Sequence, residues 1–323
     1  MDSWSFLHVS DLQPGSRRSF RFNPSQNENG MTAYQQLEAI DDVDLLIVGG
    51  DLTRDGSIHD FEYEEARAKL EALSYPYYAI PGNMDTCNKH TSLDGATGRE
   101  DPRLNVTEHQ LDNFAKFFGE YPWSFVHKNV RFSGFYAAVA GSGFPQEARM
   151  WEWLENELPN LDPAEHHVMN MHYTLFFDEL NEPNWDITKK EEYQRWYFTI
   201  DNPHRARMFD AFKKSNVGIV TSGHIHCRRP EQIIEGIRFY RCAGIAMRQW
   251  EDAWPNAEPA LGFYRFDVRE TGITDTFIPL EFESKAQGAY GLGGHPRAEE
   301  RDYLLAWEAP PVEFLQDAAG GRA

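Results

Sequence analysis

Five short polar segments, each at the end of an apolar, strand-like run, constrain this 323-residue chain more than any other feature. They are Asp11-Leu12-Gln13, Gly50-Asp51, Gly82-Asn83-Met84-Asp85, His172 and Gly223-His224-Ile225-His226. A strand fixes the root of the loop that follows it, and the loop leaves its side chains free to converge. Together the segments supply ligands for two divalent ions that share one carboxylate. Mixed oxygen and imidazole donors suit Mn, Fe or Zn better than Ca or Mg.

The runs between these segments predict a layered α/β fold. Apolar runs of strand length occur at residues 4–10, 44–49, 77–80, 124–126, 130–133, 137–140, 167–172 and 217–222, with further strands expected between 237 and 280. Helical spacing occurs at 27–40, 60–73, 108–119, 145–158 and 203–215. This alternation predicts sheets with helices outside them. Residues 86–107 are expected to form a loop, and 174–202 an insertion rich in aromatic and acidic residues.

The five segments, in this order, resemble the motifs of the calcineurin-like metallophosphoesterase family, whose members carry Asp-x-His, Gly-Asp, Gly-Asn-His-Asp/Glu, a lone His and Gly-His-x-His. The resemblance covers roughly residues 4–280 and looks closest to the cyclic-nucleotide-phosphodiesterase-like branch. It implies a four-layer sandwich of two packed mixed β-sheets flanked by helices. We therefore expect a catalytic domain over residues 1–283 and a C-terminal extension over 284–323.

The resemblance also implies a binuclear metal centre in which Asp51 bridges both ions. It places Asp11, Gln13 and His226 around the first ion, and Asn83, His172 and His224 around the second. Residues i and i+2 of an extended segment point the same way, so His224 and His226 suit two nearby ions. The implied catalytic residues are Asp51, Asn83, Asp85 and His224. The implied reaction is hydrolysis of a phosphodiester or phosphomonoester by a hydroxide that bridges the ions.

Two positions depart from the family motifs. Gln13 replaces a metal-binding His, so it either ligates weakly or bonds a metal-bound water. Met84 replaces a His thought to protonate the leaving group, and a thioether cannot transfer a proton. The proton must then come from metal-bound water or from nearby His90, unless the leaving group is acidic enough to need none. Asp85 either braces its loop or accepts a bond from bound water.

These departures support an alternative hypothesis, in which the chain binds a phosphate ligand or regulates a partner and has weak or lost turnover. Residues near the last segment leave a second choice open. Trp196, Tyr197 and Phe198 either stack on a substrate base or sugar or pack the insertion onto the sheet. The neighbouring guanidinium groups, which are candidates for gripping phosphate, belong to Arg195, Arg205 and Arg207. Cys227 is expected to be buried and inert, and His166 and His167 to lie on the surface.

Net charge, cysteine content and hydropathy limit the kinds of partner and the cellular compartment that we expect for this chain. A net charge of −20 argues against a nucleic-acid groove lined by Lys and Arg, so a small phosphate ester is the expected substrate. The three cysteines, Cys87, Cys227 and Cys242, cannot form a disulfide framework. The N-terminus enters a strand without a signal-peptide pattern, and no run approaches the roughly 18–20 apolar residues of a membrane span. These features predict a cytoplasmic protein.

Overall fold

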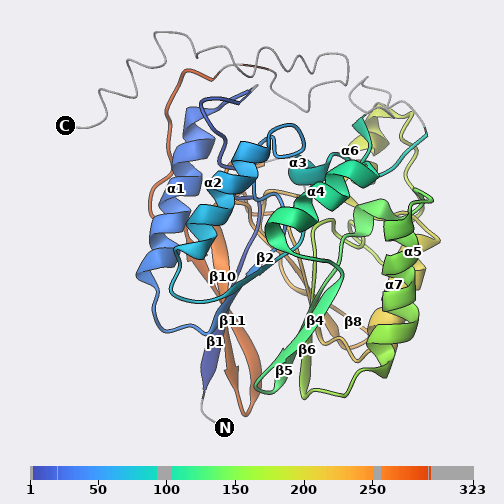
Figure 1. Ribbon diagram of the computed structural model, residues 1–323. Coiled ribbons are helices and arrows are strands. Elements are labelled where there is room, and N and C mark those ends of the chain that lie inside the picture. Colours follow the sequence, from blue (N-terminus) through green and yellow to red (C-terminus); the bar gives the residue numbers. More distant parts are fainter. Residues whose placement is uncertain (1–2, 20, 93–103, 250–255, 290, 292–323) are drawn as a thin grey trace.

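The computed structural model describes residues 3–19, 21–92, 104–249, 256–289 and 291, and in them two β-sheets pack face to face between layers of helices (Figure 1). The first sheet has the strand order β11-β10-β1-β2-β3 and the second β4-β5-β6-β7-β9-β8. The strands of the first are β1 Trp4–Val9, β2 Leu45–Val48, β3 Tyr77–Ala79, β10 Gly262–Arg269 and β11 Gly272–Pro279. Those of the second are β4 Trp123–His127, β5 Val130–Gly134, β6 His166–Met171, β7 Ile219–Ser222, β8 Gln232–Ile234 and β9 Ile237–Arg241.

The helices lie between successive strands, and α3 and α4 lie between β3 of the first sheet and β4 of the second. They are α1 Pro24–Ala39, α2 Asp60–Glu71, α3 Asn83–Thr86, α4 Glu108–Phe118, α5 Pro145–Glu152, α6 Lys190–Phe198 and α7 His204–Lys214. Local signals fix several of their ends. The Asn23 side chain accepts from the backbone N–H of Ser25 ahead of Pro24, and Thr107 and Gln110 form a capping box at the start of α4.

Side chains on alternate positions of a strand face two different layers of the core. On β1, Leu7 and Val9 face the cluster that contains residues of α1, α2 and α4, whereas Trp4 and Phe6 face the other sheet. The layer between the sheets is aromatic: Phe6 stacks on Phe266 and meets the edge of Phe132 from β5. Because side chains alternate along a strand, an unbroken apolar run predicts burial on both faces.

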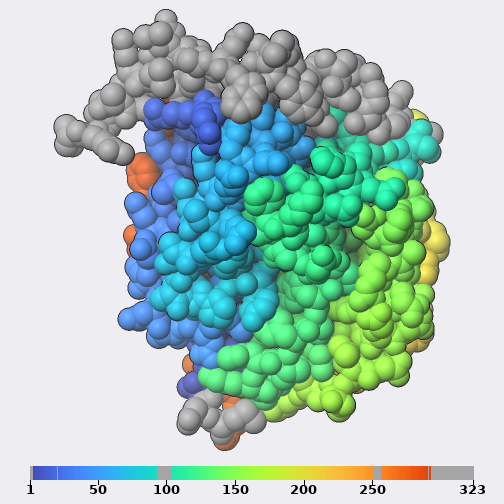
Figure 2. Space-filling view, viewed as in Figure 1, coloured from blue at the N-terminus to red at the C-terminus, as the bar shows by residue number. Residues whose placement is uncertain are grey.

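Helix α4 joins the two halves of the molecule. Its Leu111 belongs to the cluster that packs α5 and α7 on the second sheet, and its Phe114 belongs to the cluster beneath α1 and α2. Figure 2 shows the resulting surface, where the blue residues of the first half and the yellow-green residues of the second meet along green residues. The two sheets are therefore held together by the central layer and by a shared helix.

Parallel pairing brings the polar segments to one edge. Strands β1, β2 and β3 pair in parallel, as do β5, β6, β7 and β9, while β10, β11, β4 and β8 add antiparallel neighbours. The carboxyl ends of parallel neighbours lie at the same edge of a sheet, so the loops that follow β1, β2 and β3 lie together and face those that follow β6 and β7.

The predicted fold class, two mixed sheets flanked by helices, is confirmed, with two local corrections. The run predicted as a strand at 137–140 is a short 3-10 helix, Ala137–Val139, because an apolar run reports burial and not extension. His167 is not on the surface: it lies in β6, is 4% exposed, and its ring nitrogens bond the Ser215 carbonyl and the Ser133 hydroxyl.

The other predicted helices and strands lie close to their expected bounds, while residues 93–103 of the loop predicted at 86–107 lie outside the described residues. The helix predicted at 145–158 begins as α5 and continues as a π-helix, Trp153–Glu157, and a 3-10 turn, Leu158–Asn160. The segment 174–202 carries α6. Most of the predicted extension, 292–323, lies outside the described residues, and the division at 283 stays a prediction. Among the residues that are described, no helix is both long and apolar enough to cross a bilayer.

Candidate metal centre

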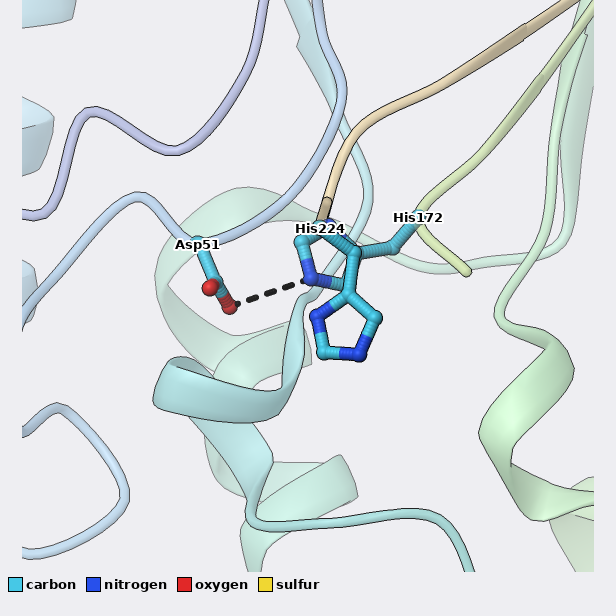
Figure 3. Close-up of side chains that lie close together, drawn as sticks. All are labelled: Asp51, His172 and His224. Atoms are coloured by element: carbon cyan, nitrogen blue, oxygen red, sulfur yellow. Dashed lines mark ion pairs between the residues drawn. The ribbon is translucent and has the colours of Figure 1, made fainter. Parts of the chain in front are cut away.

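Seven of the predicted site residues converge at the shared edge of the two sheets. Figure 3 shows three of them, Asp51, His172 and His224, which come from different elements and point toward one another. Ligand atoms of these three lie within 4.8 Å of one another, and so do ligand atoms of Asp11, Asp51 and His226. Two potential cation sites therefore share Asp51. Gln13 and Asn83 complete the set, one contacting each group.

The backbone that carries these side chains is strained. Five of the seven residues have a positive φ: Asp11 (57°), Gln13 (39°), Asp51 (53°), His224 (71°) and His226 (51°). For residues with a Cβ this conformation costs on the order of 1–3 kcal/mol each, and such strain gathers where a structure holds functional groups in place. The concentration of strained residues at one edge marks it as a functional site.

Two glycines allow the loops to meet. A Cβ on Gly82 would lie 2.8 Å from the Cγ of Asp51, and one on Gly223 would lie 2.6 Å from Oδ2 of Asp11. Both distances are shorter than real side chains tolerate. The Asp11 carboxylate instead accepts the backbone N–H of His224, with its two oxygens at 3.2 and 3.0 Å. The first and last polar segments are thereby fixed to each other.

In the second site, formed by Asp51, His172, His224 and Asn83, three acceptor atoms face one another. Nδ1–H of His172 donates to the Gly49 carbonyl at 2.8 Å, which leaves Nε2 with a lone pair. That Nε2 lies 3.1 Å from Oδ1 of Asn83 and 3.4 Å from Oδ1 of Asp51. Burial lowers the pKa of His172, so the ring stays neutral near pH 7. Acceptor atoms this close to one another form a site that a bound cation would stabilise.

His224 is prepared in the same way. Its Nε2–H donates to the Tyr197 carbonyl at 3.3 Å, which leaves Nδ1 with the free lone pair. The ring lies among aromatic side chains, with centroids 4.3 Å from Tyr173 and 4.7 Å from Phe198. Burial lowers its pKa well below the ordinary value. A neutral imidazole of fixed tautomer is the form in which histidine ligates metals.

The first site differs because an amide nitrogen lies inside it. Nδ1–H of His226 donates to the Met247 carbonyl at 2.9 Å, and its Nε2 lies 3.4 Å from Oδ1 of Asp11. Nε2 of Gln13 donates to Oδ2 of Asp51 at 2.7 Å and lies 3.4 Å from Nε2 of His226. Among the described residues, the buried Oε1 of Gln13 has no hydrogen-bond partner. Reversing the amide would point this oxygen at a cation and relieve its isolation.

The charges fit two cations. Asp11 and Asp51 are buried, and within the part of the chain that the structure describes the basic side chains close to them are the imidazoles of His226 and His172, with no Lys or Arg paired to either carboxylate. Burial raises the pKa of Asp51 well above its usual value, and the nearby charges of Asp11 and Asp85 raise it further. Two buried carboxylates, three imidazoles and two side-chain amides form a donor set of the type that binds Mn, Fe or Zn.

Comparison with known proteins places the chain in a family. The model of the calcineurin-like phosphoesterase family matches residues 5–228, which is most of the chain.

This chain belongs to the calcineurin-like phosphoesterase family. A search of curated protein sequences finds no match. Among solved structures, the chain is similar to GAP50, described as the anchor in the inner membrane complex of Plasmodium, with 14% identity, a TM-score of 0.55 and 96% of each chain covered. It is also similar to the purple acid phosphatase PPD1 of yellow lupin, with 14% identity, a TM-score of 0.56 and 90% of this chain covered. The alignment spans 53% of the lupin enzyme. These likenesses show the shared fold.

In this calcineurin-like phosphoesterase, the Asp85 carboxylate is engaged by donors of its own and a neighbouring loop. Its carboxylate accepts four hydrogen bonds, from the N–H groups of Leu52 (3.2 Å), Thr53 (3.0 Å) and Gly82 (2.8 Å) and from the Thr53 hydroxyl (2.7 Å). Burial raises its pKa to about 6 even though these bonds favour the charged form. The contacts give Asp85 the bracing role and leave its predicted catalytic role without geometric support.

The guanidinium groups predicted to grip phosphate are engaged elsewhere. Arg205 is fully buried and donates to the carbonyls of Ile200, Leu180 and Glu182. Arg195 pairs with Asp178, and Arg207 pairs with Glu155 and lies over the ring of Trp151. Arg205 is thus used within the insertion, while phosphate gripping by the half-exposed Arg195 and Arg207 stays a prediction.

Other predicted residues have mixed outcomes. Trp196 and Phe198 are buried and pack the insertion, as one of the two hypotheses held, whereas Tyr197 is half-buried beside His224. Cys227 is buried, and burial raises the pKa of its thiol to about 12, which keeps it protonated. His90 is half-buried and donates its backbone N–H to Ala138; a role as proton donor stays a prediction.

Some contributors to the site carry no sequence signal. The carbonyls of Gly49, Met247 and Tyr197 set the tautomers of the three candidate histidine ligands, and every residue has a carbonyl. The loop at 244–247 is equally hidden: the N–H groups of Ile245 and Ala246 donate to the Asp11 carbonyl. Its position follows from the pairing of β9 beside β7 and not from a motif.

Proposed function

We propose that this protein is a metal-dependent phosphoesterase that hydrolyses a small phosphate ester. The observation that carries the proposal is the pair of acceptor clusters that share Asp51 at the edge of the two sheets. Two bound ions would supply a water of lowered pKa and would offset negative charge on the phosphate oxygens. The family and the lupin phosphatase fold support a phosphoesterase.

The chain's own contribution is to fix donors before the ions arrive. Asp51 directs Oδ1 toward His172 and Oδ2 toward Gln13, so its carboxylate reaches both sites. The Met84 backbone N–H holds Oδ1 at 2.8 Å and prevents the carboxylate from rotating. Neutral imidazoles and neutral amides limit the negative charge to Asp11 and Asp51, which leaves bound divalent ions electrophilic. These features support Mn, Fe or Zn as the resident ions.

The third motif shapes the substrate preference. Met84 is 7% exposed, and the Nη2 of Arg21 lies 4.0 Å from its sulfur. A thioether in this position supplies no proton to a departing oxygen. We infer that esters with acidic leaving groups are the better substrates, whether they are diesters or monoesters.

Hydrolysis of 4-nitrophenyl phosphate and bis(4-nitrophenyl) phosphate in the presence of Mn tests the proposal. Asp51→Asn is expected to lower the rate at least about a hundredfold, because one change disturbs both ions. Asp42→Asn is the matched control, since Asp42 forms a surface pair with Arg265 and should leave the rate unchanged. Near-normal activity of Asp51→Asn at saturating Mn would contradict the shared role of Asp51.

A second candidate is a phosphate-binding or regulatory protein with little turnover. The amide of Gln13 inside the first site and the thioether of Met84 favour it, and the fold is also used by a protein described as an anchor. This candidate predicts Mn-dependent binding of inorganic phosphate, measured by calorimetry, without hydrolysis of either nitrophenyl ester. Hydrolysis that disappears in Asp51→Asn would exclude it.

A further inference from the structure

The insertion is rooted beside a candidate ligand. Thr174, two residues after His172, donates its N–H and its hydroxyl to the Phe198 carbonyl at 3.2 and 3.0 Å. Thr174 and Thr199 also form an isolated parallel bridge. The chain between Thr174 and Thr199 forms a long loop that leaves the sheet and returns to it, and α6 is the last segment of this loop. The last turn of α6 is therefore held at the metal centre.

That last turn presents Tyr197 to two of the three neutral ligands expected in the second site, Asn83 and His224. The amide Nδ2 of Asn83 donates to the Tyr197 hydroxyl at 3.1 Å, and Nε2 of His224 donates to the Tyr197 carbonyl at 3.3 Å. The Tyr197 ring centroid is 5.0 Å from that of His224. One residue thus touches two of the four residues expected around the second ion.

The contact with Asn83 decides which end of its amide faces the site. Nε2 of His172 is an acceptor 3.1 Å from Oδ1 of Asn83, so without an ion the amide would gain a hydrogen bond by turning its NH2 group toward His172. The Tyr197 hydroxyl opposes that rotation, because it accepts from Nδ2 while its own proton points to Oδ1 of Asn88 at 3.5 Å. The oxygen of Asn83 is thereby kept toward the ion.

Lys89 anchors the turn that carries Tyr197. Its buried ammonium donates to the carbonyls of Trp196 (2.5 Å) and Thr199 (2.7 Å) and lies 4.1 Å from the Trp196 ring centroid. Its backbone N–H donates to the hydroxyl of Tyr173, whose ring faces His224. Because Lys89 follows the third motif by four residues, it links the loop after β3 to the end of α6.

We propose that Tyr197 is a positioning residue that orients Asn83 and His224 for the second ion, and that Lys89 holds it in place. The inference rests on the proposed metal site but not on turnover. It gives the insertion a function: docking of α6 sets the affinity of the second ion. Residues that orient ligands in this way typically change metal affinity about 10- to 100-fold when they are removed.

Mn titration of the chelator-treated full chain by calorimetry tests the proposal. Tyr197→Phe keeps the ring and the backbone carbonyl and removes only the hydroxyl, so it should weaken the second ion about tenfold. Lys89→Met and Asn88→Ala should weaken it in the same direction. Tyr75→Phe is the control, since it deletes a buried hydroxyl that donates to the Leu37 carbonyl at 2.6 Å and should leave Mn affinity unchanged.

A rescue separates orientation from general loosening. A carboxylate presents equivalent oxygens, so Asn83→Asp removes the need to orient that ligand. In the Asn83→Asp background, Tyr197→Phe should change Mn affinity much less than it does in the wild type, and an equal loss in both backgrounds would overturn the orienting role. Unchanged Mn affinity of Tyr197→Phe would also overturn it. If the wild type itself binds no Mn, the proposed function fails together with this inference.

Discussion

At the scale of single residues, Gln13 distinguishes the first ion site from the second. In the second site the acceptors face one another with no donor between them, whereas in the first the amide NH2 of Gln13 already bonds Oδ2 of Asp51. An ion that enters the first site must displace that hydrogen bond and reverse the amide. The first ion should therefore bind more weakly than the second.

Gln13→His is expected to tighten the first ion. Imidazole is a better donor than an amide oxygen for this class of ion, and it does not compete for Asp51 from within the site. The Mn concentration for half-maximal activity should fall by about tenfold. Gln146→His is the control, because Gln146 bonds Asp112 on the surface. An unchanged titration midpoint would place Gln13 outside the ligand set.

Met84→His is expected to change how the rate depends on the leaving group. In the wild type, nitrophenyl esters should react far faster than alkyl esters of the same charge, since a nitrophenolate departs without a proton. A histidine at this position would return a proton donor and help alkyl esters most. A series of esters with graded leaving groups, assayed on both proteins, measures the slope. A flat dependence in the wild type would contradict this account of Met84, because either another group, such as His90, supplies the proton or chemistry does not limit the rate.

At the scale of elements, β6 positions two buried histidines. His172, a candidate ligand, directly follows the strand, and His167, which has a structural role, lies within it. His167 bonds the Ser133 hydroxyl on β5 and the Ser215 carbonyl after α7. Burial lowers its pKa to about 4, so the folded protein keeps the ring neutral. In the unfolded chain, the imidazole of His167 takes up a proton near its ordinary pKa of 6.5. Stability is therefore lost as the pH falls from about 6.5 toward 4.

His167→Gln should remove this part of the pH dependence. From the two pKa values, the wild type should lose about 2 kcal/mol of unfolding free energy through His167 between pH 7 and pH 5. His8, whose pKa burial also lowers to about 4, contributes its own slope to both proteins. Urea unfolding with a chelator present, at both pH values, measures the difference. Parallel losses in the two proteins would contradict the neutral state of His167.

The strands that lead into the motifs were predictable, because each is a short, mainly apolar run that is followed by a polar residue or a Gly. The same apolar pattern gave a wrong strand prediction at residues 137–140, where buried Ala and Val residues form a short 3-10 helix. It also missed the burial of His167, because its partners are a hydroxyl and a carbonyl on other elements. The position of the polar segments at strand ends predicted which residues converge. It could not predict that the Gln13 amide turns its nitrogen toward Asp51, or that Arg205 bonds backbone carbonyls.

At the scale of the whole molecule, the ligand set spans both sheets. Asp11, Asp51 and Asn83 follow strands of the first sheet, and His172, His224 and His226 follow strands of the second. Ions at this edge would tie the two halves together and would bind only the folded chain. Binding of that kind stabilises by about 2.7 kcal/mol when the free ion is at a hundred times its Kd.

Added Mn is therefore expected to raise the Tm of the chelator-treated wild type by several degrees. Asp51→Asn should lose most of this shift, because both ions depend on Asp51. Asp42→Asn should keep it, since Asp42 lies in a surface pair. Thermal unfolding at several Mn concentrations measures the effect, and a shift of equal size in all three proteins would show that Mn acts at other sites.

The central claim is that the acceptor clusters around Asp51 are a metal centre, and the metal content of the protein tests it most directly. Elemental analysis after loading with Mn, Fe or Zn and removal of free ions should find between one and two ions per chain, with the shortfall from two reflecting the amide of Gln13. Asp51→Asn should retain far less metal. A wild-type protein that retains no transition metal after loading would contradict the assignment.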